Sequence, residues 1–179
     1  MADSLSGLEV PELRAARSIG DIGSGAGFPG LVLAAALPAA RIDLIESAGR
    51  KAEVSERLAQ TAGLGNVRAI HRRAEEWRKE VYDAVTARAL APLAVVVEYA
   101  APLLREGGVL VAWKGARHED EESAGAAAAA QLGLGPAAVL PVHPFEGARN
   151  RHLHVFTKEG PTPDRFPRRP GMARKRPLG

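Results

Sequence analysis

Cysteine is absent from the chain, and aromatic residues make up only 4% of its 179 residues. The absence of cysteine excludes disulfide bonds and thiolate metal sites, and it is compatible with a reducing compartment. No apolar run approaches the roughly twenty residues needed to span a bilayer, and the N-terminus lacks the basic-then-apolar pattern of a signal peptide. We therefore expect a cytoplasmic protein with no membrane partner and no bound metal.

Acidic residues are missing from the last part of the chain. The cations from residue 165 onward are Arg165, Arg168, Arg169, Arg174, Lys175 and Arg176. The net charge of the whole chain is only +3, so this basic tail follows a nearly neutral body. Such a tail favours a polyanionic partner, but a solvated, proline-rich tail without a specific role explains the same residues equally well.

Hydrophobic residues form 46% of the chain, and its length suits one domain with a continuous core. Because aromatic residues are few, alanine and small aliphatic side chains must fill most of that core. We expect residues 1–17 to be a lead-in, residues 18–158 to form the domain, and residues 159–179 to form a basic tail whose prolines end regular structure.

Strand and helix patterns alternate along the domain. Strands are predicted over residues 18–22, 41–45, 67–71, 82–88, 109–114, 139–142 and 153–157, and helices over 30–37, 51–62, 93–104 and 118–132. This alternation predicts an α/β fold with a doubly wound, mostly parallel, Rossmann-like sheet between two helical layers. The last two strands have no helix between them, so we expect an antiparallel edge.

Residues 21–30 read Asp-Ile-Gly-Ser-Gly-Ala-Gly-Phe-Pro-Gly and are the most informative part of the sequence. The alternate glycines, Gly23, Gly25 and Gly27, let the backbone turn sharply and approach a ligand without a Cβ in the way. The segment follows a predicted strand and opens a predicted helix. This order is typical of the first turn of a nucleotide-binding α/β unit.

The same loop also indicates which nucleotide binds. It matches the dinucleotide pattern GxGxxG, with Glu46 at a suitable distance, but that signal is weak alone. Pro29 removes a backbone donor that phosphates would need, and Asp21 would repel a phosphate while suiting a sulfonium or ammonium group. We therefore expect S-adenosylmethionine, with Glu46 accepting hydrogen bonds from the ribose hydroxyls.

A third contact is expected after the strand at 67–71. Ala74 is small enough to lie against an adenine ring, and the Glu75 segment can accept a hydrogen bond from the exocyclic amine. Taken alone, Glu75 could equally be a surface charge that opens a short helix. Its place in register with the glycine loop and Glu46 favours the cofactor role.

Several short motifs together resemble the RsmG (GidB) family. They are residues 21–30, Arg-Ala-Glu at 73–75, Thr-Ala-Arg-Ala at 86–89, Trp-Lys-Gly at 113–115, Arg-His-Leu at 151–153, Pro-Arg-Arg-Pro-Gly at 167–171 and Pro-Leu at 177–178. The resemblance implies a class I methyltransferase that modifies N7 of one guanine in the decoding-region loop of 16S ribosomal RNA. It also implies 16S ribosomal RNA or the small ribosomal subunit as partner.

The resemblance assigns cofactor contacts to Gly23, Phe28, Ala74, Glu75 and Arg88, and the reasoning from residue chemistry adds Asp21, Gly25 and Glu46. Members of the family carry a further helical segment before the first strand. The Asp-Ser-Leu at residues 3–5 resembles the last piece of that segment. We therefore expect residues 1–17 to be its remnant.

Two cations at strand ends are the predicted catalytic residues. Guanine N7 carries an in-plane lone pair and no proton, so positioning matters more than a general base. We expect Arg88 to lie nearest the cofactor and the base, and Lys114 to donate to guanine O6 or a phosphate; strand-end salt bridges are the alternative. The residues expected to bind RNA are Lys114, Arg151, His152, Arg168 and Arg169, although His152 could instead be an ordinary edge histidine.

Other functions remain compatible with these motifs. The chain could methylate another nucleic acid, or it could be an RNA-binding relative that lost its chemistry. The basic tail argues against a small-molecule substrate, and an NAD-dependent oxidoreductase is a more distant alternative. We expect a monomer.

Overall fold

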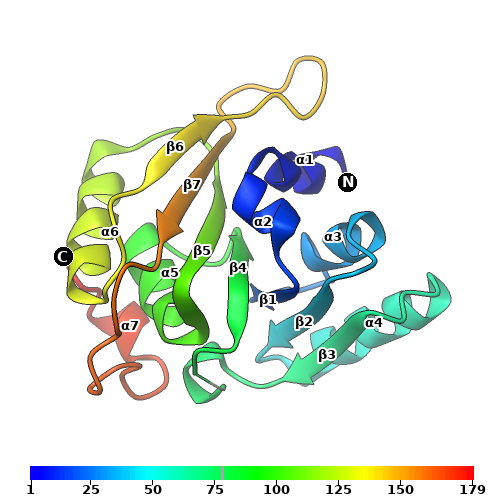
Figure 1. The fold of residues 1–179 in the computed structure, drawn as a ribbon, viewed down its shortest axis with the longest axis horizontal. Coiled ribbons are helices and arrows are strands. Elements are labelled where there is room, and N and C mark those ends of the chain that lie inside the picture. Colours follow the sequence, from blue (N-terminus) through cyan, green and yellow to red (C-terminus); the bar gives the residue numbers. More distant parts are fainter. Residues whose placement is uncertain (78) are drawn as a thin grey trace.

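The computed structural model describes residues 1–77 and 79–179, and its centre is a single mixed sheet (Figure 1). Its seven strands lie in the order β3-β2-β1-β4-β5-β7-β6. The strands are β1 (Ser18–Ile22), β2 (Arg41–Glu46), β3 (Val67–His71), β4 (Tyr82–Arg88), β5 (Leu104–Lys114), β6 (Ala138–Pro141) and β7 (His152–Thr157).

The strand pairing confirms the predicted α/β sheet. Strand β1 lies between β2 and β4 and runs parallel to both, with Ile19 opposite Ile42 on one side and Ala84 on the other. Strand β7 is antiparallel to both neighbours, β5 and β6. The parallel strands therefore end at one edge of the sheet, where a doubly wound fold places its ligands.

Helices cover both faces of the sheet, as predicted for three layers. The helices are α1 (Ala2–Leu5), α2 (Pro11–Ala15), α3 (Gly30–Ala36), α4 (Gly49–Thr61), α5 (Leu93–Ala100), α6 (Glu119–Gln131) and α7 (Met172–Lys175). One buried cluster joins the sheet to α2 and α3, and another joins it to α5, α6 and α7. Within the described ranges, no helix is long and apolar enough to cross a membrane.

The segment between α5 and β5 differs from the prediction. The helix expected over residues 93–104 ends at Ala100 and is followed by a short 3₁₀ turn over Ala101–Leu103. Pro102 cannot continue the hydrogen-bond ladder of an α-helix. Strand β5 then begins at Leu104, five residues before the predicted start at 109, and its pairing with β4 is irregular between Tyr82 and Ala84.

The two ends of the chain also contain more structure than the sequence indicated. The lead-in folds into α1, a 3₁₀ turn over Ser6–Glu9 and α2, and it buries Val10 and Leu13 in the core. The tail was expected to lack regular structure, but it forms α7 and buries Phe166 and Ala173. Apolar side chains between the prolines and arginines explain why the tail packs on the body.

Candidate active site

The glycine loop connects β1 to α3 at the carboxyl edge of the sheet. Gly23 has φ +65°, and a Cβ at this position would lie 2.4 Å from Cδ1 of Leu90. At Gly30 a Cβ would lie 2.2 Å from Cδ2 of Leu44 and 2.8 Å from Oδ2 of Asp21. These two positions require glycine because the loop must pass close to the loop after β4 and to β2.

Asp21 lies beneath this loop and is fully buried. Its Oδ2 accepts the Gly30 N–H at 3.0 Å, and its Oδ1 accepts the hydroxyl of Thr86, the register partner of Asp21 on β4, at 2.8 Å. Burial raises the pKa of Asp21 to about 7, although the bonds from Thr86 and Gly30 lower it.

This geometry changes the interpretation of Asp21. The sequence suggested that its carboxylate faces a positive group of the cofactor, but the side chain has no exposed surface with which to do so. Its two hydrogen bonds instead join the first turn of α3 to β4. Asp21 therefore shapes the glycine loop from below.

Glu46, at the end of β2, also holds the loop. Its Oε2 accepts the Gly25 N–H at 3.0 Å and its Oε1 accepts the Ala48 N–H at 2.8 Å. Each carboxylate oxygen can accept a further hydrogen bond. The predicted contact of Glu46 with ribose hydroxyls stays a prediction.

A hollow of about 310 Å³ opens beside the glycine loop. It is lined by Gly23, Ile45, Ser47, Arg72, Arg73, Ala74, Glu75, Leu90, Tyr99 and Arg174. Its size is at the lower end of the roughly 300–1,000 Å³ of small-ligand pockets. Three of the predicted cofactor residues, Gly23, Ala74 and Glu75, meet here although they come from two different loops, so we name it the cofactor hollow.

A second hollow, of about 360 Å³, contains the predicted catalytic cations. It is lined by Asp3, Arg88, Ala89, Trp113, Lys114, Gly115 and Arg151, and we name it the substrate hollow. Arg88 and Ala89 line this hollow, whereas the next residue, Leu90, lines the cofactor hollow. The loop after β4 therefore lies between the two hollows.

The cations of the substrate hollow already have partners in the protein. Nη1 of Arg88 lies 3.2 Å from Oδ2 of Asp3, and its guanidinium lies 5.7 Å from the centre of the Phe28 ring. Nζ of Lys114 lies 2.5 Å from Oε1 of Glu121 and donates to the Ala91 carbonyl at 3.2 Å. The strand-end salt bridges considered for both residues are thus present, and their roles toward substrate stay predictions.

The other predicted RNA-binding residues are divided between two regions. Arg151 is exposed at the substrate hollow, and the Nδ1–H of His152 donates to the Gly115 carbonyl at 2.9 Å. Arg168 lies elsewhere, in a bidentate ion pair with the buried Glu98. Arg169 is exposed on the same segment. The ion pair with Glu98 occupies the guanidinium of Arg168 in this structure, and the predicted RNA contacts of Arg168 and Arg169 stay predictions.

Sequence reasoning did not select Asp3, Tyr99 or Arg174 as site residues. Asp3 belongs to α1, and its backbone carbonyl accepts the indole N–H of Trp113 at 2.8 Å. The only signal for it was the Asp-Ser-Leu resemblance at residues 3–5. Arg174 was visible only as one cation of a basic tail, and its position depends on how that tail packs.

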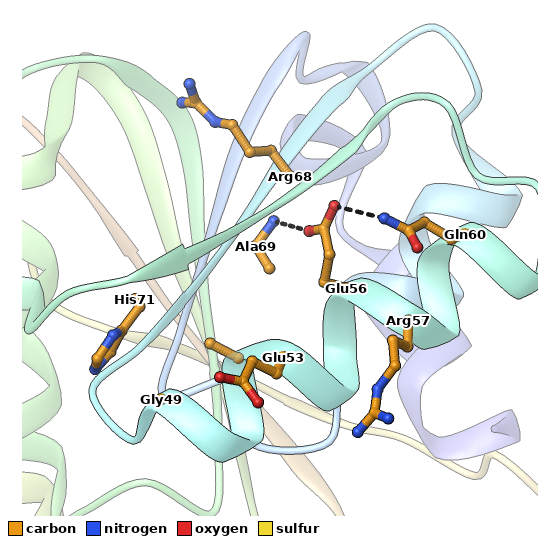
Figure 2. Close-up of a pocket in the computed structure, with 9 residues that line it drawn as sticks. Gly49, Glu53, Glu56, Arg57, Gln60, Arg68, Ala69 and His71 are labelled. Atoms are coloured by element: carbon orange, nitrogen blue, oxygen red, sulfur yellow. Dashed lines mark hydrogen bonds between the residues drawn. The ribbon is translucent and has the colours of Figure 1, made fainter.

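A larger hollow lies elsewhere, between α4 and the edge strand β3 (Figure 2). It measures about 680 Å³. Glu56 crosses it to accept the Ala69 N–H at 3.1 Å and a bond from Gln60 at 3.3 Å, while Arg68 is bound by Asp43. No residue of the glycine loop lines it, so we do not assign the cofactor to this hollow.

The sheet order, the glycine loop and the paired hollows define a class I S-adenosylmethionine-dependent methyltransferase fold. The methyltransferase SibL, solved in its apo form, superposes with a TM-score of 0.71 at 15% identity, over 88% of this chain and 55% of that one. An O-methyltransferase of Thermotoga maritima gives a TM-score of 0.67 at 17% identity, over 90% and 66%. These likenesses confirm the predicted fold.

The family model described as rRNA small subunit methyltransferase G (GidB) matches residues 1–153, so the chain belongs to this family. The ribosomal RNA small subunit methyltransferase G of Rubrobacter xylanophilus is 44% identical, over 98% of this chain and 70% of that protein. The protein of the same name from Chloroflexus aggregans is 46% identical, over 88% and 68%. Membership of a methyltransferase family with a class I fold makes S-adenosylmethionine the cofactor, as predicted.

Proposed function

We propose that this protein transfers a methyl group from S-adenosylmethionine to N7 of a guanine in the decoding-region loop of 16S ribosomal RNA. The observation that carries the proposal is the loop after β4, because Arg88 and Ala89 face one hollow and Leu90 faces the other. A donor in the cofactor hollow and a base in the substrate hollow would meet across this loop. The family name and the cationic lining of the substrate hollow support an RNA substrate.

Methyl transfer to guanine N7 requires little proton transfer by the protein. S-adenosylmethionine supplies an electrophilic methyl group on a sulfonium. Guanine N7 attacks it with an in-plane lone pair and carries no proton, so no general base is required. The protein contributes by aligning the two reactants and excluding water.

Three side chains have defined roles in this proposal. The guanidinium of Arg88, fixed between Asp3 and the Phe28 ring, holds the base near the methyl donor. Lys114 leaves Glu121 and donates to guanine O6, and the exposed Arg151 contacts the RNA backbone. The guanine must first be unpaired, because the groove of an A-form helix hides its N7 edge from side chains.

The test is methyl transfer to unmodified 16S ribosomal RNA, followed by nuclease digestion and mass spectrometry of the nucleosides. We expect 7-methylguanosine at one position with the wild type. The variant Lys114→Ala should lose the product while retaining affinity for S-adenosylhomocysteine. Lys51→Ala, which changes an exposed cation of α4, is the matched control and should keep full activity.

Each other outcome has a defined meaning. Product at a different nucleotide, or in a different nucleic acid, would replace the proposed substrate. Cofactor binding without methylation of any nucleic acid would favour the alternative of an RNA-binding relative that has lost methyl transfer. Unchanged methylation by Lys114→Ala would remove Lys114 from the mechanism.

A further inference from the structure

The C-terminal segment, residues 166–176, packs beside the cofactor hollow. Phe166 and Ala173 are each only 2% exposed and join the same buried cluster as Tyr99 of α5. Helix α7 lies next to α5 (Figure 1). The match to the family model covers residues 1–153, so this segment lies outside the matched residues.

Three polar contacts fix this segment to the body. Arg168 binds the carboxylate of Glu98 through two nitrogens, one of them Nε at 2.7 Å. The Gly171 N–H donates to Oε1 of Glu75 at 3.0 Å. Nη2 of Arg174 donates to the carbonyl of Leu90 at 3.0 Å.

Two of the three partners, Glu75 and Leu90, belong to the cofactor hollow. Arg174 itself lines it as well. Tyr99 also lines the hollow. Burial raises the pKa of Tyr99, the nearby charge of Glu75 raises it further, and Arg174 lowers it. The segment therefore contributes Arg174 to the lining of the hollow and contacts Glu75, another lining residue, through the Gly171 N–H.

The chemistry of an arginine suits this place. A guanidinium is planar and stacks on aromatic rings more readily than an ammonium does. The bond to the Leu90 carbonyl limits the positions of the Arg174 guanidinium before any ligand arrives. Preorganisation of this kind lowers the cost of binding.

We propose that Arg174 is a cofactor-binding residue that stacks on the adenine ring of S-adenosylmethionine, and that residues 166–176 hold it there. This inference rests on the methyl-donor chemistry of the proposed function. It gives part of the basic tail a role that needs no RNA. Arg168 anchors the segment through Glu98, and Arg174 contacts the ligand.

The experiment measures binding of two adenosine ligands by calorimetry in the absence of RNA. S-adenosylhomocysteine carries the adenosine and amino-acid portions, whereas 5′-methylthioadenosine lacks the amino-acid portion. We expect Arg174→Ala to weaken both ligands by a similar factor of about ten. Arg174→Lys should stay weak because it keeps the charge and loses the plane. Lys175→Ala, the adjacent exposed cation outside the hollow, should bind like the wild type.

The possible results separate the inference from the proposed function. Equal affinity of wild type and Arg174→Ala for both ligands would overturn the role of Arg174 alone. A loss confined to S-adenosylhomocysteine would place Arg174 at the amino-acid end and would also overturn the adenine contact. A wild type that binds neither ligand would overturn the methyl-donor chemistry itself. Urea unfolding should show Arg174→Ala less stable than Lys175→Ala by only about 1 kcal/mol, the usual value of one hydrogen bond, because it loses the bond to the Leu90 carbonyl and no buried apolar contact.

Discussion

Oδ2 of Asp3 lies 3.2 Å from Nη1 of Arg88, so the first helix of the chain is joined to the carboxyl end of β4. Both side chains are partly exposed, at 25% and 30%, and both line the substrate hollow. The indole of Trp113 fixes the backbone of Asp3 from the other side. We therefore expect Asp3 to act as a positioning residue for the predicted catalytic arginine.

Replacing Asp3 by Asn should lower methyl transfer without changing the fold. The variant keeps the shape of the side chain but removes the charge that holds Arg88. A partly exposed ion pair is worth up to about 1 kcal/mol, so we expect kcat to fall by about fivefold. The measurement is steady-state methylation of 16S ribosomal RNA, with Glu9→Gln, an exposed acid of the lead-in, as control. An unchanged kcat would show that Arg88 needs no partner at Asp3.

The stability contributed by Asp21 should depend on pH. Its pKa is raised from 3.8 to about 7 in the folded state, so the folded protein holds a proton that the unfolded chain loses. The contribution of Asp21 to the free energy of unfolding is full below about pH 4 and declines as the pH rises to about 7. It declines because Asp21 ionises in the unfolded chain while it stays protonated in the folded protein.

The matched comparison is with Asp21→Asn, which cannot ionise. Urea unfolding of both proteins between pH 5 and pH 8 should show the wild type losing stability relative to the variant, by up to about 1.4 kcal/mol per pH unit below the folded pKa. A constant difference across this range would mean that Asp21 is already ionised in the folded protein.

Removal of the Arg168 guanidinium should destabilise the protein strongly. Glu98 is only 1% exposed, and Arg168→Ala leaves its carboxylate buried without its cationic partner. Breaking such a pair costs about 3–5 kcal/mol. Chemical denaturation should show this loss for Arg168→Ala and less than about 0.5 kcal/mol for Lys175→Ala. A small effect at both positions would indicate a loosely attached C-terminal segment.

Ala89, in the loop between the two hollows, has a left-handed backbone with φ +54°. Such a conformation is costly for alanine and easy for glycine. Ala89→Gly should therefore raise the free energy of unfolding by about 0.5–1 kcal/mol. The control Ala126→Gly, on the exposed face of α6, should lower it by about 1 kcal/mol. If both variants lower it, the strain at Ala89 is not released by glycine.

Much of the sheet could be predicted from the sequence because local patterns define it. Strand β1, the glycine loop and α3 follow one another within residues 18–36, and each has its own signal there. The start of β5 was predicted too late because the residues before Gly107 resemble the end of a helix. Pairing with β4, which no local pattern reveals, makes them a strand.

The site was predicted in part for the same reason. Gly23, Ala74 and Glu75 follow strands, so the topology alone brings them to one edge of the sheet. The structural role of Asp21 beneath the glycine loop depends on its hydrogen bond from Thr86, which lies 65 residues away along the chain. The positions of Arg168 and Arg174 depend on how an arginine-rich tail packs against α5, whereas composition alone indicated either a polyanionic partner or a solvated tail.

The cofactor hollow is formed by residues from opposite ends of the chain, Gly23 after the first strand and Arg174 in the last helix. During synthesis, the glycine loop leaves the ribosome well before α7 does. The nascent chain can therefore pair most of its sheet before both sides of this hollow are present.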